Sequence, residues 1–277
     1  DKGHHLILGD LNAHALGGDA VIADGHDRSA AAGADQIEDD HQRDQNAAGL
    51  GEDGGKGGAQ NIQLHYDFGS SIYSTEEDGR QDVTATFEKF SADNLGSWYY
   101  FVDLDIDKDG VMGAYTEVSR EFNFAKASET SSFAAHIEFD GGMGRGGSYQ
   151  SAGLIGAAWN GHNADFSTTY SVQAMYKQFF KQSGGIDGYA SFQLTGVWST
   201  NFANNACTFS GFIDLWRGEG AYHHGKLVVL SEPQLWYNIS PKFSIGTEVE
   251  ISNNFIYNTA NDNSFFINPT LAVKFNL

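Results

Sequence analysis

Hydrophobic and polar residues alternate with period two over much of the chain beyond residue 60. In the segment 98–123, Trp98 and Val102 lie on one face of the first arm, and Asp103 and Asp105 lie on the other. A short turn containing Asp and Gly follows, and the second arm repeats the alternation. Successive side chains of a strand point to opposite faces. The pattern therefore predicts a β-hairpin with one apolar face and one acidic face.

Similar segments, separated by turn signals, follow one another at near-regular spacing. A soluble sheet would bury the apolar face, whereas a transmembrane barrel turns it toward lipid and its polar face toward a lumen. Strands of ~9–11 residues cross a bilayer at a tilt. We therefore predict an all-β fold, an antiparallel up-and-down transmembrane β-barrel of about 12 strands. The expected strands are 61–68, 83–90, 98–107, 111–123, 132–140, 149–159, 166–179, 188–199, 207–218, 227–239, 243–252 and 265–277.

Residues 1–60 differ from the rest of the chain. They contain no Phe, Trp or Tyr, and 12 acidic residues stand against 4 basic ones. Such a segment buries too little apolar surface to offset its chain entropy, so we expect it to be disordered, loosely attached or not native to the mature protein. Its histidines follow no metal-ligand spacing. Two units are predicted, a polar segment over 1–60 and a barrel over 61–277.

The composition and net charge exclude several classes of partner and binding site. The net charge of −20 argues against nucleic acid as a partner, because nucleic-acid binding needs a basic face. The single cysteine, Cys207, excludes an internal disulfide framework and a zinc cluster. No run approaches the roughly 18 apolar residues of a membrane helix. The expected location is the outer membrane of a Gram-negative bacterium, with membrane lipid as a partner.

The connections give the predicted barrel a direction. With the first strand running outward, the longer connections, such as 70–82 and 253–263, fall outside, and the shorter ones, such as 91–95 and 238–241, fall on the periplasmic side with both termini. The last strand alternates up to Leu277. It resembles the C-terminal strand that outer-membrane assembly machinery recognises, and that machinery is a second expected partner.

Charged side chains are costly toward lipid, so the alternation sends them inward. In one interpretation, the charged side chains of the interior are solvated or pair with one another. In the other, the interior is an acidic pore lined in part by aromatic rings, and it repels anions and admits neutral or cationic solutes. Its aromatic residues serve equally well as stacking platforms, as packing or as an interfacial girdle. The candidate pore-lining and substrate-contacting residues are Tyr99, Asp103, Asp105, Glu117, Glu121, His136, Glu138, Asp214, Trp216, Glu232, Gln234, Glu248 and Glu250.

Two local patterns suggest other chemistry. The run from Asp105 to Gly110 matches the start of a calcium loop, but Thr116 stands where the loop needs Glu, and strands flank it instead of helices. We expect a hairpin turn there, with bound calcium as the less favoured alternative, and otherwise no resident metal and no cofactor. A Ser–His site on the barrel wall is the enzymatic alternative, but no local signature supports it, and His223 and His224 fall in an expected outer loop. We predict no catalytic residues and no enzyme activity.

The segments 115–117, 211–216 and 232–236, read together with the number and spacing of the strands, show a family likeness. From residue 61 onward the chain resembles the nucleoside-specific channel-forming, Tsx-like outer-membrane proteins. The resemblance implies a narrow, monomeric barrel of twelve strands that passes nucleosides by diffusion. It does not extend to residues 1–60.

These observations predict a passive outer-membrane channel for small neutral polar solutes, with nucleosides as the first candidates. The alternative is a closed barrel with a structural or surface-binding role and no transport. A soluble β-sandwich or lipocalin-like binder is a third hypothesis, and it requires the apolar faces to point inward.

Overall fold

The computed structural model describes residues 58–277, apart from 145–146, 183–185, 220–224, 257 and 259–260. The expectations for residues 1–57 and for His223 and His224 therefore lie outside the described residues. Within the described part of the chain, no helix is long and apolar enough to cross a membrane.

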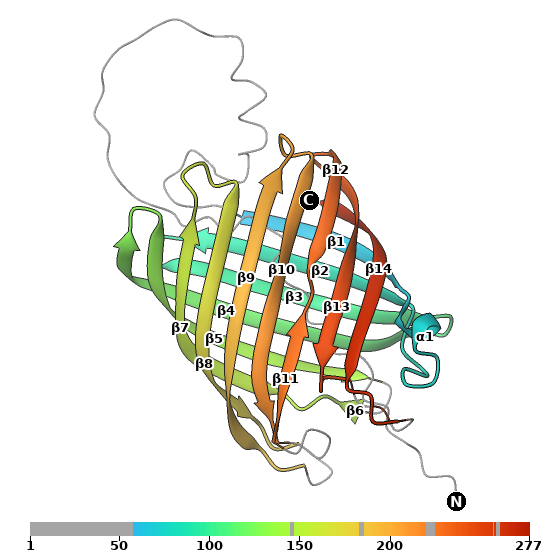
Figure 1. Ribbon diagram of the computed structural model, residues 1–277. Helices are drawn as coiled ribbons and strands as arrows, with labels where there is room; N and C mark the ends of the chain where they lie inside the picture. Colours follow the sequence, from blue (N-terminus) through green and yellow to red (C-terminus); the bar gives the residue numbers. More distant parts are fainter. Residues whose placement is uncertain (1–57, 145–146, 183–185, 220–224, 257, 259–260) are drawn as a thin grey trace, which may run out of the picture.

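Nearly all of the described chain is β-strand (Figure 1). One turn of helix, α1 (Gly69–Ile72), follows the first strand. The first seven strands are β1 (Gly58–Asp67), β2 (Val83–Asp93), β3 (Gly96–Asp107), β4 (Gly110–Ser128), β5 (Ser131–Gly144), β6 (Gly147–Ser148) and β7 (Ala152–His162). The others are β8 (Thr168–Phe179), β9 (Tyr189–Phe202), β10 (Cys207–Gly218), β11 (Lys226–Ser231), β12 (Gln234–Ser240), β13 (Phe243–Asn253) and β14 (Phe265–Asn276).

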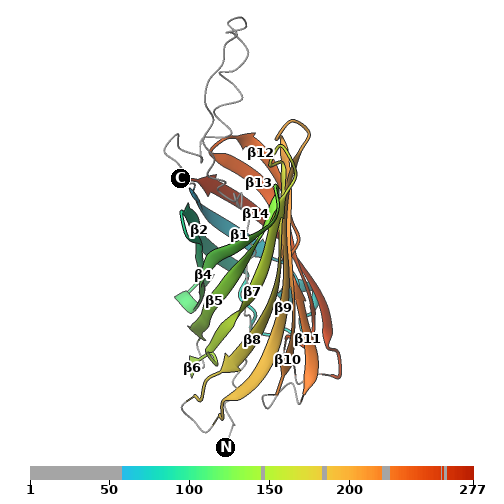
Figure 2. The same cartoon turned by 90° about the vertical axis from the view of Figure 1, so that its left-hand side faces the viewer.

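The strands form one closed antiparallel barrel. β1 pairs with β14, with Asn61 opposite Asn276, and the ladder runs unbroken around to β10. Because β11 and β12 both pair with β10 and β13, they share one position, while the two-residue β6 only flanks β5. The barrel therefore has twelve strand positions, and the predicted fold is confirmed. It is broad in Figure 1 and narrow in the view of Figure 2, so its cross-section is flattened.

The predicted strand 227–239 is interrupted. Pro233 has no N–H for the ladder, and β11 ends before it while β12 begins after it. Opposite this break, Gly211 has a φ of 153°, and a Cβ on it would lie 2.7 Å from the carbonyl oxygen of Glu232. Only glycine allows both that backbone conformation and that close approach. The break keeps hydrogen bonds to both neighbours, from Glu232 N–H to Phe212 (3.2 Å) and from Val249 N–H to Pro233 (3.0 Å).

Apolar side chains cover the outer surface, and polar side chains line the inside. Exposed residues such as Leu64, Ile155 and Leu194 alternate along their strands with buried polar ones. An apolar surface of this extent requires lipid or detergent as its solvent. The soluble sandwich and lipocalin-like hypotheses, which need the reverse arrangement, do not fit.

Arg120 is an exception to the apolar outer face, and the sequence analysis did not single it out. It lies on the apolar face of β4, close to the β2–β3 turn, where its Nη2 donates to Asp93 (2.8 Å). Its guanidinium lies 5.2 Å from the ring of Trp98 and 4.9 Å from that of Phe122. Aromatic faces attract a cation, and the carboxylate balances its charge. These contacts hold the arginine at one end of the barrel.

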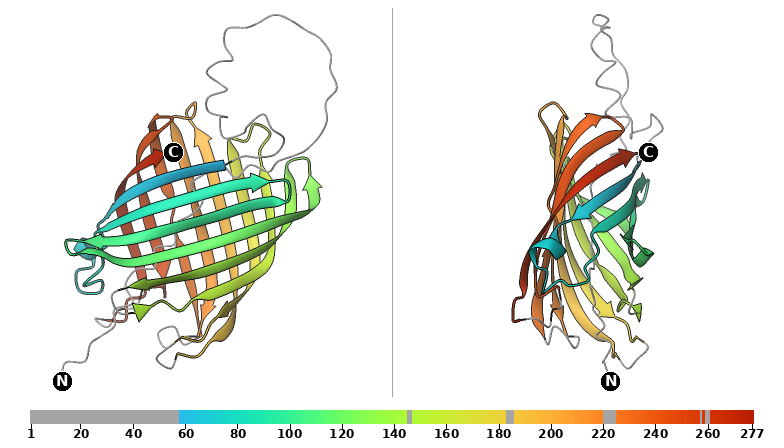
Figure 3. Two further views of the ribbon diagram at one scale, coloured as in Figure 1. Left: turned by 180° about the vertical axis from the view of Figure 1, so that it is seen from behind. Right: turned by 90° about the vertical axis from the view of Figure 1, so that its right-hand side faces the viewer.

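The two ends of the barrel differ in their connections. β1 begins and β14 ends at the same end, where Leu277 N–H donates to Gln60 (3.0 Å). The connections at that end are short, as between β2 and β3 or between β12 and β13. Most connections at the opposite end, including the one between β1 and β2 that carries α1, are longer. Figure 3 shows β1 to β5 from behind, crossing the barrel at a steep tilt.

The outward placement of Leu194 gives a direct prediction. Leu194 lies near the middle of β9 and is 48% exposed. Leu194→Arg should lower the free energy of unfolding in lipid vesicles by about 2–4 kcal/mol, because a charge there faces hydrocarbon. The same change at Leu227, near the end of β11, should cost about 0–1 kcal/mol. Urea titration of vesicle-folded protein measures both, and equal losses would contradict the assigned orientation.

Candidate functional site

All thirteen candidate residues lie on the inner face of the barrel wall. Ten are buried, whereas Tyr99, Glu117 and Glu138 are partly buried. They come from six strands and from the break before β12, so the closed ladder brings distant parts of the chain into one interior. Their contact with a solute stays a prediction, but their geometry separates them into connected groups.

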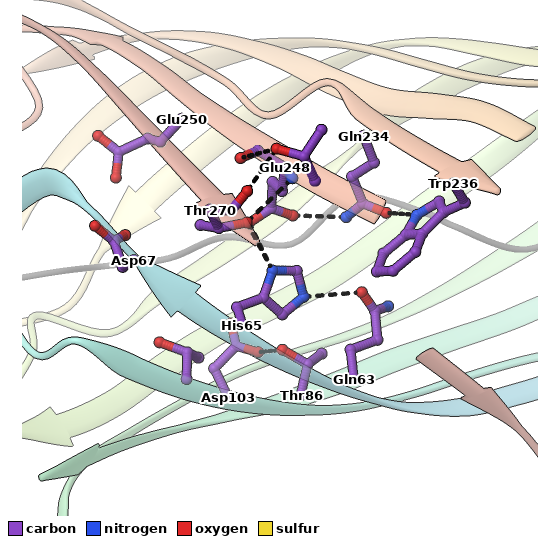
Figure 4. Close-up of polar contacts among 12 residues, drawn as sticks. Gln63, His65, Asp67, Thr86, Asp103, Gln234, Trp236, Glu248, Glu250 and Thr270 are labelled. Atoms are coloured by element: carbon purple, nitrogen blue, oxygen red, sulfur yellow. Dashed lines mark hydrogen bonds and ion pairs between the residues drawn. The ribbon is translucent and has the colours of Figure 1, made fainter. Parts of the chain in front are cut away.

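The first group, the His65 network, joins β1, β12, β13 and β14 (Figure 4). His65 contacts Thr270 through Nδ1 (3.2 Å) and Gln63 through Nε2 (3.0 Å). Gln234 donates to Glu248 (2.6 Å) and accepts from the indole N–H of Trp236 (2.8 Å). The His65 ring lies edge-on to Trp236, with 6.1 Å between centroids. Donors and acceptors thus satisfy one another around the fully buried ring of Trp236.

Arg80, which the sequence analysis did not single out, fastens the β1–β2 connection to the inner wall. Its Nη2 lies 2.8 Å from Asp67 Oδ2 and 3.0 Å from Glu250 Oε2, and its Nε lies 3.4 Å from Glu77 Oε2. Asn268 donates to Glu77 (2.9 Å). The available clue was that Arg80 is the one basic residue in a connection that meets an acidic interior. The β1–β2 connection therefore folds into the barrel at the end that has the longer connections.

Lys177 centres the second group, the Lys177 cluster, on the opposite wall. Its Nζ lies 2.9 Å from Asp140 Oδ2 and donates to Gln193 (2.7 Å). It also lies 5.2 Å from the ring centroid of Phe179 and 5.3 Å from that of Trp216. The period-two pattern of β8 could have revealed Lys177, because Ser171, Gln173 and Met175 precede it on the same buried face.

Glu117, Glu138 and Asp140 each offer a carboxylate oxygen within 4.8 Å of the others. Carboxylates suit a hard cation such as Ca²⁺ or Mg²⁺. The Lys177 ammonium already occupies one of them, so the described arrangement is an ion-pair cluster. The calcium-like run forms the expected hairpin turn: Asp105 accepts from Thr84 on the barrel wall, and Asp107 caps the exposed turn by accepting from Asp109 N–H (2.6 Å).

His136 lies between two carboxylates. Its Nδ1 is 3.2 Å from Glu121, and its Nε2 is 3.1 Å from Glu138. Imidazole donates from both nitrogens only when it is protonated, so this arrangement favours the imidazolium ion. Because both nitrogens face carboxylates, His136 is not placed to activate a serine.

Aromatic and apolar side chains cross the flattened interior. Tyr115 on β4 packs against a cluster on the opposite wall that includes Phe212, Trp216 and Leu230. Phe101 extends the aromatic lining, since its ring centroid lies 6.0 Å from that of Tyr115 and 6.1 Å from that of Tyr99. Packed side chains therefore span the interior where Tyr115 meets the cluster that contains Trp216.

The comparisons with known proteins bear on the fold. A family model described as "Domain of unknown function (DUF5020)" matches residues 59–277, and the chain belongs to that family. No curated protein matches the sequence. The solved NanC porin superposes with a TM-score of 0.53 at 13% identity, covering 79% of this chain and 100% of that one. The KdgM porin gives a TM-score of 0.46 at 11% identity, covering 79% and 99%.

At such low identity the NanC likeness shows a shared fold, that of a porin barrel. Nothing in the comparisons singles out the Tsx-like proteins, so that resemblance stays a prediction.

The Arg80 contacts predict a large and specific loss of stability. Arg80→Met removes the cation but leaves Asp67, Glu77 and Glu250 buried, and breaking a buried pair in this way costs about 3–5 kcal/mol. Lys108→Met is the matched control, because the Lys108–Asp109 pair is exposed and such pairs contribute at most about 1 kcal/mol. Urea unfolding of both variants checks this, and a loss for Arg80→Met no larger than that of the control would refute it.

Glu77 predicts a pH dependence. Burial raises the pKa of Glu77 from 4.5 to about 7, against the opposing effects of Arg80 and Asn268. The folded protein thus retains a proton that the unfolded chain releases, so the free energy of unfolding should fall as pH rises from about 4.5 to 7. Glu77→Gln should remove this part of the slope. The urea midpoint measured across that range for both proteins tests it, and parallel profiles would contradict the prediction.

Proposed function

We propose that this DUF5020-family barrel is a passive outer-membrane channel for small neutral polar or cationic solutes, with nucleosides as the first candidates. The observation that carries the proposal is the inversion of the two faces, because apolar residues cover the outside while charged and amide side chains line the inside. That arrangement suits a protein with lipid around it and a polar path through it.

The character of the interior supports the choice of solute. Carboxylates outnumber basic groups among the thirteen candidates and their contacts, with Arg80, Lys177, Lys274 and the His136 imidazolium as the buried cations. A negative field repels phosphates and carboxylates and favours neutral or cationic solutes. Nucleosides are uncharged, have a flat ring and carry several hydrogen-bonding groups. The rings of Tyr99 and Tyr115, which are only partly buried, offer stacking surfaces, and the partly buried carboxylates of Glu117 and Glu138 offer hydrogen-bond acceptors.

The fold likeness supports the class of protein. The similar NanC structure is that of a porin. We further propose membrane lipid as the partner of the apolar surface, and the outer-membrane assembly machinery as the partner of the final strand, β14, whose outward residues Leu271, Val273 and Phe275 are exposed. The proposed location is therefore a bacterial outer membrane, with no enzymatic role.

A closed barrel is the second candidate. It is favoured by the contact of Tyr115 with the opposite wall and by the full burial of side chains such as Phe101 and Trp236. Such a barrel would serve a structural or surface-binding role without transport.

Swelling of liposomes that contain the purified protein separates the two functions. A channel should let uridine and adenosine in several times faster than uridine monophosphate, because the interior repels the phosphate. Tyr115→Ala removes the side chain that spans the interior and serves as the comparison. No swelling with the natural protein, together with swelling for Tyr115→Ala, would identify a closed barrel and overturn the channel.

A further inference from the structure

Glu232 occupies an unusual place on the inner wall. It lies between β11 and β12, where buried residues continue the period-two pattern on both sides, Leu230 before it and Gln234 and Trp236 after it. Its side chain therefore points into the barrel. It is 0% exposed, and neither carboxylate oxygen has a hydrogen-bond partner in the described part of the chain.

The backbone holds this carboxylate in position. Glu232 N–H is bonded to Phe212, Pro233 restricts the following residue, and the backbone of Gly211 approaches closely from β10. The strand cannot rotate to bring the carboxylate out of the barrel without breaking the ladder to both neighbours.

The charged groups that act on Glu232 are mostly acidic. Glu248 and Glu250 lie buried on the adjacent strand β13, and the nearby cation Arg80 is bonded to Glu250. Arg80 is already matched by Asp67, Glu77 and Glu250, and Glu248 accepts from Gln234. The field at Glu232 is therefore negative, and nothing described nearby supplies the donor that a buried carboxylate requires.

The number of available ligands limits what can bind. A divalent ion such as Ca²⁺ takes several oxygen ligands at once. Among the described residues, the one group of acidic side chains with that spacing is Glu117, Glu138 and Asp140, which does not include Glu232. Glu232 alone supplies one negative charge and two oxygen ligands, so the ion that it suits is one with a single positive charge.

We propose that Glu232 is a binding site inside the barrel for a singly charged cation, either an alkali ion or the ammonium group of a small solute. A role of Glu232 in ion selectivity rests on the proposed channel function. Cation binding at Glu232 does not depend on that function.

Single-channel reversal potentials test the selectivity. In a KCl gradient the natural protein should prefer K⁺ over Cl⁻, and Glu232→Gln should reduce that preference at least about fivefold, because even a charge contact screened as in bulk water has about that effect. Glu129→Gln, which makes the same change on the exposed β4–β5 turn, should have no effect. A preference unchanged by Glu232→Gln would overturn the proposal.

Replacing K⁺ by ethanolammonium on one side distinguishes the two sources of charge. If Glu232→Gln lowers the permeability of ethanolammonium more than that of K⁺, the site takes solute ammonium groups. If the two fall together, it takes any singly charged cation. Both results support the site.

A binding measurement keeps the proposal testable if the barrel does not conduct. Thallium(I), a K⁺ analogue, quenches tryptophan fluorescence, and Trp236 lies four residues after Glu232 on the same face. Saturable quenching of folded protein in detergent should disappear in Glu232→Gln and persist in Glu129→Gln. Such a result without conductance would reject the channel and retain the site. Quenching that is identical in both variants would reject the site.

Discussion

The closed backbone ladder is the constraint on which the rest of this structure depends. In an apolar solvent each backbone N–H and C=O needs a partner within the protein, and a barrel supplies one without leaving a free strand edge. The pairing of β1 with β14 completes that closure. Closure fixes which face of each strand is inside, so charged side chains far apart in the sequence have to share one interior.

That sharing explains the local chemistry. An interior crowded with carboxylates needs counterions and donors, because an uncompensated buried charge is costly. Arg80 comes in from the β1–β2 connection to meet Asp67, Glu77 and Glu250, and Lys177 meets Asp140 on the other wall. Glu232 is the carboxylate that no described group compensates. The same acidity that shapes the interior sets which solutes it favours.

Much of the fold could be predicted because period-two alternation is a local pattern that can be recognised in the sequence of each strand alone. The inner placement of residues such as Asp103 and Glu248 followed from it. The Arg80 contacts could not be predicted, because they depend on how a connection folds back across strands distant in the sequence. The alternation places Arg120 outward, but its partners, Asp93 and two aromatic rings, could not be predicted. The approach of Gly211 to the break at Pro233 could not be predicted either.

The central claim is the inversion of the two faces, and adjacent residues on β9 test it most directly. With Cys207, the only cysteine, replaced by Ser, spin labels can be placed at Leu194, which is 48% exposed, and at Thr195, which donates to Asp214 inside the barrel. In lipid vesicles, the label at 194 should be accessible to oxygen and protected from a water-soluble nickel complex, whereas the label at 195 should not be accessible from lipid. The reverse pattern, with 194 accessible to nickel and 195 in an apolar core, would contradict the account.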